Sequence, residues 1–192
     1  MLIWYLARAA GVTAFGLLSI ATAAGVITSR PAKSPSQRVI TQYLHRSTAL
    51  AGLAMLVLHI VTVLGDTYAK VSLTSVFVPM TAGYRPVAVS LGVLALWAFV
   101  LVGLTGALRA RFTVSDKAVR SWRKIHLLSY LAWFASAWHF WFTGTDTGQW
   151  WARAVLFLGV AGVLAAVVTR LSEEPERKPA TGRPPARIGG RV

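Results

Sequence analysis

Apolar residues along this chain gather in five long blocks, which short polar or basic segments separate. The blocks cover residues 2–28, 39–64, 87–108, 119–142 and 150–171. Each block is long enough to cross about 30 Å of hydrocarbon, because a helix rises about 1.5 Å per residue. The sequence therefore predicts an all-α integral membrane bundle of five transmembrane helices in a lipid bilayer.

The basic residues set the predicted orientation of this bundle. They concentrate in the connectors 29–38 and 109–124 and in the C-terminal tail. The basic residues expected on the opposite side are Arg8, Lys70, Arg85 and Arg153. Because the cytoplasmic loops of membrane proteins are enriched in Lys and Arg, the N-terminus is predicted outside and the C-terminus in the cytoplasm. We expect a multi-pass protein of the cell membrane.

The two ends of the chain differ in character. The first apolar block has its main positive charge after it rather than before it, which predicts a retained anchor and not a cleaved signal peptide. Residues 172–192 are rich in Pro, Gly and charge, a composition typical of a disordered basic tail. The predicted membrane domain is therefore 1–171.

Composition excludes several classes of protein. Of the 192 residues, 55% are hydrophobic and 14% are charged, a balance that favours lipid as the solvent. The absence of Cys excludes disulfides, thiolate-ligated clusters and covalent haem attachment. The net charge of +14 lies in runs between apolar blocks, so nucleic acid is not an expected partner. No Gly-rich phosphate loop opens a helix, so neither a flavin nor a nicotinamide site is predicted.

The candidate chemistry lies in the four histidines. His45 and His59 fall in the second predicted helix, and His126 and His139 fall in the fourth. Ionisable residues inside a membrane are costly and generally serve a function. Because these two helices run in the same direction, His45 shares one depth with His126, and His59 shares another with His139. The two levels are about 20 Å apart along the bundle.

Paired imidazoles on facing helices are the axial ligands that six-coordinate haem b requires, since the porphyrin supplies the other four nitrogens. The sequence thus predicts two haem b groups, an inner one ligated by His45 and His126 and an outer one ligated by His59 and His139. The 13-residue step from His126 to His139 turns the second ring about 140° around an ideal helix, so tightening, a kink or different approach angles are required. The alternative for each histidine is an interhelical hydrogen bond. Zinc or copper is a weaker alternative, because two imidazoles leave either ion short of ligands.

This arrangement resembles the ferric reductase-like transmembrane domain, the di-haem core also found in NADPH oxidases. The matching features are the histidine spacing, the segments VFVPMTAGYRP and TGTDTG, and WRKIH before His126. The resemblance covers residues 1–171 and points to the small stand-alone bacterial members, with 15 Arg against 5 Lys indicating an actinobacterial one. It implies the same two haem sites. It also implies that the flavin- and nicotinamide-binding reductase module of the well-known enzymes is a separate cytoplasmic partner.

Basic side chains near the two levels are candidates for binding haem propionates. Arg46 and Arg123, with Lys124, are placed for the inner haem, and Arg85 is placed for the outer one. Alternatives for the outer haem are Tyr84, Lys70, Arg8 and Arg153. Basic residues at membrane boundaries also snorkel or set topology, so this second interpretation stays open for each of them.

Trp133 is a further candidate, because it lies between His126 and His139 on the same predicted helix. Its ring is placed to fill the gap between the haems, with Gly52 leaving space opposite; ordinary packing is the alternative. The segment VSLTSVFVPM of the outer connector suits a short interfacial helix over the outer haem.

The predicted function is a transmembrane di-haem b cytochrome that carries single electrons from a cytoplasmic donor to an outer acceptor, such as a ferric chelate, oxygen or a partner protein. Such activity as a ferric reductase-like oxidoreductase would depend on the separate dehydrogenase partner, and no catalytic acid, base or nucleophile is predicted. A quinol-linked cytochrome b subunit or a superoxide-handling oxidase is the nearest alternative. A non-haem permease or assembly subunit, in which the histidines bridge helices, is the alternative from another class.

Overall fold

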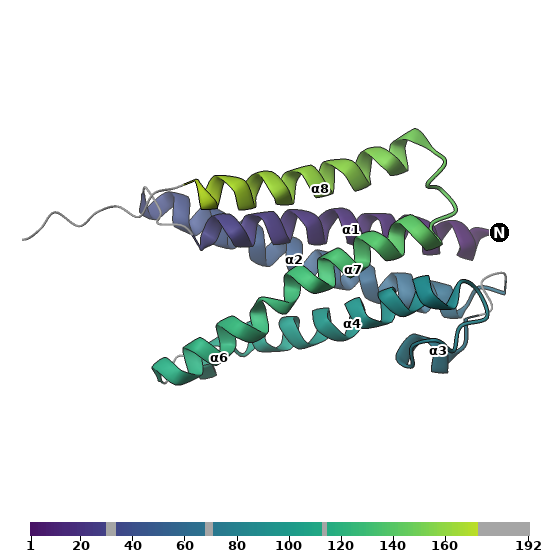
Figure 1. Cartoon of the computed structure of the whole chain (residues 1–192), viewed down its shortest axis with the longest axis horizontal. Helices are drawn as coiled ribbons and strands as arrows, with labels where there is room; N and C mark the ends of the chain where they lie inside the picture. Colours follow the sequence, from purple (N-terminus) through teal and green to yellow (C-terminus); the bar gives the residue numbers. More distant parts are fainter. Residues whose placement is uncertain (30–33, 68–70, 113–114, 173–192) are drawn as a thin grey trace, which may run out of the picture.

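The computed structural model of the protein describes residues 1–29, 34–67, 71–112 and 115–172. Within these residues all regular secondary structure is α-helical, as the sequence predicts. The helices are α1 (Leu2–Thr28), α2 (Pro35–Leu64), α3 (Leu73–Phe77), α4 (Pro86–Ala107), α5 (Arg109–Phe112), α6 (Asp116–His126), α7 (Leu128–Thr143) and α8 (Trp150–Leu171) (Figure 1). Lys70 and most of the predicted tail, 173–192, lie outside the described residues.

Four of the described helices, α1, α2, α4 and α8, are long and apolar enough to cross a membrane. They confirm four of the five predicted spans, with α2 beginning four residues earlier than expected. Their apolar side chains also face outward, as in Leu50, Val57 and Val61 on α2, which are all more than half exposed. An exposed apolar surface of this kind marks a protein that contacts lipid, so the chain is a multi-pass membrane protein.

The predicted fourth span, 119–142, is wrong as a single helix. The structure divides this segment at Leu127 into α6 and α7. With 16 residues, α7 alone is too short to cross about 30 Å of hydrocarbon. The two helices nevertheless run in succession beside α4, antiparallel to it (Figure 1). Trp122 Nε1 donates to Thr105 O at one end of α4, and Arg85 at the other end donates to Phe142 O. Together α6 and α7 therefore extend from one end of α4 to the other.

Local chemistry explains where α2 and α6 begin. Ser34 Oγ accepts a hydrogen bond from Gln37 N at 3.2 Å, and Pro35 follows as the first helical residue. Ser115 Oγ accepts from Ala118 N at 3.2 Å in the same way, with Asp116 in the first turn. A hydroxyl cap, a proline at the first position and an acid near the helix N-terminus are the usual signals of a helix start.

Helix α1 is the centre of the bundle and packs against α2, α7 and α8 (Figure 1). Small side chains along α1 are buried, which lets neighbouring helices approach closely; they are Ala7, Ala10, Ala14, Ala21 and Ala24. The larger buried side chains meet between α1, α4 and α7, where Phe15, Leu18, Phe99 and Trp133 form the core. The bundle thus consists of two antiparallel helix pairs, α1 with α2 and α4 with α6–α7, joined by this core, with α8 against α1.

The predicted short helix of the outer connector is present as α3. Ser72 Oγ caps it by accepting from Ser75 N at 3.1 Å. It is tied to α4, because Trp97 Nε1 donates to Phe77 O at 3.2 Å and the rings of Phe77 and Trp97 contact each other. Helix α3 therefore lies beside the end of the bundle at which α4 begins.

Candidate functional site

The four histidines form two facing pairs at two levels of the bundle. The ring centroids of His45 and His126 are 6.1 Å apart, with an interplanar angle of 67°. Those of His59 and His139 are 6.4 Å apart, with an angle of 76°. The pairs that the sequence matched by depth are thus the pairs that face one another, one ring from α2 and one from α6–α7 in each.

Three of the four rings are held by a backbone carbonyl of the antiparallel neighbour. His45 Nδ1 lies 2.8 Å from Ala21 O, and His59 Nδ1 lies 2.8 Å from Ala7 O, both on α1. His139 Nδ1 lies 2.9 Å from Ala88 O on α4. Because a carbonyl only accepts, Nδ1 must carry the hydrogen, and the neutral ring then has its lone pair on Nε2.

A glycine lies one helical turn after each of these carbonyls, and the imidazole packs against it. A Cβ added at Gly92 would lie 2.7 Å from His139 Cε1, one at Gly11 would lie 2.9 Å from His59 Nδ1, and one at Gly25 would lie 3.2 Å from His45 Cε1. Any side chain at these positions would displace the ring. The glycines are therefore part of the site, although the sequence analysis missed them.

A spacing in the sequence could have revealed them. Gly11 and Gly25 on α1 are 14 residues apart, the same step as His45 and His59 on α2. Gly92 and Gly106 on α4 repeat that step opposite the second histidine pair. The two helix pairs of the bundle thus share one arrangement. In each pair, two glycines lie on the first helix and two histidines lie on the segment that packs against it.

The break at Leu127 accounts for the 13-residue step between His126 and His139. Leu127 lies between α6 and α7, and Tyr130 N bonds to Leu127 O at 3.1 Å, a contact three residues apart instead of four. A tighter turn of this type rotates the chain further per residue than an α-helix does. The break allows His126 and His139 to face α2 together, which a continuous helix would prevent.

The geometry of each pair fits a bis-imidazole haem. A metal–imidazole nitrogen bond is about 2 Å long and the nitrogen lies about 1 Å from its ring centroid, so two rings on opposite sides of one iron have centroids about 6 Å apart. Both pairs have this separation. No cluster of three or more His, Cys, Asp or Glu side chains occurs among the residues that the structure describes, so each pair offers two protein ligands. That number suits a macrocycle that supplies four nitrogens better than it suits zinc.

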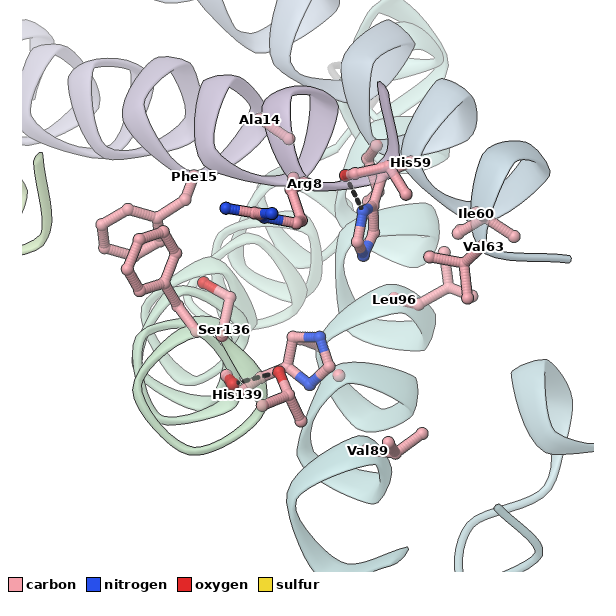
Figure 2. Close-up of a pocket in the computed structure, with 18 of the residues that line it drawn as sticks. Arg8, Ala14, Phe15, His59, Ile60, Val63, Val89, Leu96, Ser136 and His139 are labelled. Atoms are coloured by element: carbon pink, nitrogen blue, oxygen red, sulfur yellow. Dashed lines mark hydrogen bonds between the residues drawn. The ribbon is translucent and has the colours of Figure 1, made fainter. Parts of the chain in front are cut away.

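A cavity of about 230 Å³ adjoins the His59–His139 pair. Figure 2 shows the two rings directed toward one another across it. Most of its lining is apolar and comes from α1, α2, α4 and α7, and Ser75 and Val76 of α3 close one side. This is the position over the outer site that the sequence predicts for the connector helix.

Arg8 forms an ion pair with Asp146 at the edge of this cavity. Arg8 lies on α1, and Asp146 lies in the connector between α7 and α8. The guanidinium also lies over the rings of Trp4 and Tyr5. Since Asp146 already neutralises its charge, Arg8 is a weak candidate for a propionate.

Arg85 and Tyr84 both contact the C-terminal end of α7. Arg85 donates to Phe142 O, and Tyr84 Oη donates to Thr143 O at 3.5 Å. These carbonyls belong to the last turn of α7, which has no partners of its own within the helix. Arg85 is therefore a cap of α7, close to the His59–His139 level where the sequence placed it.

Trp133 is buried halfway between the two levels, and its ring stacks on Phe15 at a centroid distance of 6.5 Å. The space expected opposite Gly52 is filled, because α1 approaches closely there: a Cβ at Gly52 would lie 2.9 Å from Leu18 Cγ. The layer between the levels is therefore packed side chains of the core.

The basic residues near the other level remain at the surface. Arg46 on α2 and Arg123 on α6 are exposed. The exposed basic residues of α5 and α6 form what we call the basic face, which consists of Arg109, Arg111, Lys117, Arg120, Arg123 and Lys124. Trp122, which the sequence analysis did not single out, lies between this face and His126, with its ring stacked on the imidazole at 4.9 Å.

Comparisons with protein-family models, curated proteins and solved structures find no match to this chain.

Proposed function

We propose that this protein is a transmembrane di-haem b cytochrome, in which His45 and His126 ligate one haem and His59 and His139 ligate the other. The observation that carries the proposal is the pair of facing imidazoles at each of two levels, with centroid separations of 6.1 Å and 6.4 Å. A single facing pair has many explanations. Two pairs of nearly equal separation, one from α2 and α6 and the other from α2 and α7, favour a repeated cofactor site.

The protein's part in this function is to fix the ligands and their surroundings. The carbonyls of Ala21, Ala7 and Ala88 hold the Nδ1 hydrogen of three rings, which directs each Nε2 lone pair into the bundle. The apolar lining of the cavity lowers the local dielectric and limits access of water. When bound, each haem supplies an iron that gains or loses one electron.

Permease or assembly roles explain less of this arrangement. Histidines that only bridge helices would need the Nδ1 bonds to α1 and α4 and nothing more. Among the described residues the hydrogen bonds of these rings involve Nδ1 alone, and each Nε2 has no protein partner. All four rings are partly buried, and a lone pair that no protein group uses is available there to a ligand.

The proposed topology has the N-terminus outside, five crossings including α6–α7, and the basic face in the cytoplasm. The positive-inside rule supports this orientation. A cytoplasmic flavoprotein with an acidic docking surface is then the proposed electron donor, because opposite charge would guide it to the side of His126. The acceptor, whether a ferric chelate, oxygen or a partner protein, would be served from the His59–His139 level.

The test is the haem content of the purified protein and of four variants. A pyridine haemochrome assay should find two b-type haems per chain. His45→Leu and His126→Leu should each lose the same haem, and His59→Leu and His139→Leu should each lose the other. A protein without haem would favour a non-haem function, and His45→Leu and His139→Leu variants with matching spectra would overturn the pairing.

Electron paramagnetic resonance adds a readout of geometry. The rings of both pairs are nearly perpendicular, at 67° and 76°. Both ferric haems should therefore be low-spin, with the strongly anisotropic signal that perpendicular axial imidazoles produce. A high-spin signal from either haem would mean that one histidine of that pair is not a ligand.

A further inference from the structure

His126 differs from the other three histidines in its hydrogen bonding. Its Nδ1 is buried and has no partner within the described part of the chain. By analogy with the other rings, its partner should be the carbonyl four residues before Gly106, which is that of Val102. A Cβ at Gly106 would lie 3.8 Å from His126 Cε1, against 2.7 Å for Gly92 and His139, so this ring also lies further from its neighbouring helix.

The side chain of Thr105 explains why Val102 O is not the partner. Thr105 Oγ1 donates to Leu101 O at 2.8 Å and also to Val102 O at 3.1 Å. The equivalent positions after Ala7, Ala21 and Ala88 are Ala10, Ala24 and Leu91, none of which carries a hydroxyl. The single hydroxyl hydrogen of Thr105 is thus shared between Leu101 O and Val102 O, and it contacts the carbonyl that corresponds to the imidazole partner at the other three sites.

Trp122 and Arg109 hold the ring in its different position. Trp122 stacks on His126 with an interplanar angle of 23°, and its Nε1 is anchored to Thr105 O at 3.1 Å. The guanidinium carbon of Arg109 lies 5.0 Å from the centroid of Trp122, on the basic face. His126 thus has an aromatic ring and a nearby cation where the other histidines have a carbonyl acceptor.

These contacts affect how strongly His126 donates to a metal. An Nδ1 hydrogen bond to a carbonyl gives an imidazole more negative character and makes Nε2 a better donor, which stabilises the ferric state. A ring without that bond and beside a cation favours the ferrous state. At the His59–His139 level both rings have the carbonyl bond.

We propose that Thr105 and Trp122 are positioning residues that raise the reduction potential of the haem at the His45–His126 level above that of the haem at the His59–His139 level. This inference rests on the proposed di-haem function. Its consequence is that the first electron to enter the oxidised protein would reside beside the basic face. The second electron would then occupy the level that adjoins the cavity.

The experiment is a spectroelectrochemical titration of the purified holoprotein and its variants. The haem that His126→Leu removes should be reduced first. Thr105→Val should free the Val102 carbonyl for the Nδ1 hydrogen, and should raise the oxidised-to-reduced ratio of that haem about tenfold at a fixed potential, a shift of about 59 mV for one electron. Trp122→Leu should shift the same haem in the same direction, whereas Trp122→Phe, which keeps the stacked ring, should restore most of the difference.

Matched controls separate positioning from general loss of structure. Thr22→Val on α1 removes a similar hydroxyl-to-carbonyl bond, to Leu18 O at 2.8 Å, beside Ala21 but without touching a carbonyl that a histidine uses; it should leave both potentials unchanged. Equal potentials in the unaltered protein, or equal shifts in Thr105→Val and Thr22→Val, would overturn this inference while leaving the di-haem assignment intact. A protein that contains no haem would overturn the proposed function itself, and this inference with it.

Discussion

Trp133 Nε1 donates a hydrogen bond to Ser19 Oγ at 2.9 Å, and this bond joins α7 to α1 halfway between the two histidine levels. Both residues are buried. Ser19 Oγ in turn donates to Phe15 O at 2.8 Å, so its hydroxyl both accepts and donates a hydrogen bond. A polar contact therefore joins α7 to α1 within a mainly apolar core.

Ser19→Ala should destabilise the protein by about 1–3 kcal/mol, because it leaves the indole N–H buried without a partner. Trp133→Phe removes the indole N–H, so no buried donor is left without a partner. This variant should lose stability only because the smaller ring packs less well. Thermal unfolding in detergent measures both. Ser47→Ala is the control and should change little, because Ser47 is exposed and its hydroxyl donates to Leu44 O within its own helix. Equal stability of the Ser19 and Ser47 variants would show that the contact does not stabilise the packing of α7 on α1.

Gly92→Ala should cost the protein one haem, since the new methyl group would lie 2.7 Å from the His139 ring and push it off Ala88 O. Gly106→Ala is the matched control on the same helix, because its methyl group would lie 3.8 Å from His126, an ordinary contact. The control should keep both haems and gain up to about 1 kcal/mol from the better helix propensity of Ala. Haem content per chain distinguishes the two, and retention of both haems by Gly92→Ala would contradict the close packing.

Breaking the ion pair of Arg8 and Asp146 should loosen the connector over the cavity. Asp146→Asn leaves a partly buried guanidinium without its counter-charge, at a cost of about 1–3 kcal/mol. The double variant Arg8→Gln with Asp146→Asn should cost less than the sum of the two single changes. Arg153→Gln is the control in the same region, because Arg153 is exposed and, within the described residues, its side chain bonds to Thr147 O alone. Additive losses of melting temperature would mean that the pair contributes no coupling energy.

Reduction of the haems by a soluble flavoprotein should depend on the basic face. Arg111→Gln, Lys117→Gln and Arg120→Gln together should slow rapid-mixing reduction, and the rate in the unaltered protein should fall as ionic strength rises. Arg153→Gln, at the opposite end of the bundle, should leave the rate unchanged. If quinol reduces the haems faster than any soluble donor and the three changes have no effect, the quinol-linked alternative replaces the flavoprotein donor.

The sequence alone determined most of the long apolar helices and the relative depth of each histidine. Apolar length acts along a single segment, and Pro86 begins α4, so α1, α4 and α8 begin and end within one residue of their predicted limits. The depth of a histidine follows from the same local count, because each residue adds a constant rise. For this reason His45 could be matched with His126, and His59 with His139, before any fold was known.

Only the tertiary structure decided how each imidazole is held. The carbonyls of Ala7, Ala21 and Ala88 meet their rings through antiparallel packing, which joins residues up to 52 positions apart. The break at Leu127 follows from the same cause: an unbroken α6–α7 would turn His139 away from α2, so packing against α4 and α1 favours two helices over one. The different environment of His126, between Thr105 and Trp122, likewise exists only where α4 and α6 meet. A local sequence pattern does not predict which backbone carbonyls already accept a hydrogen bond from another side chain.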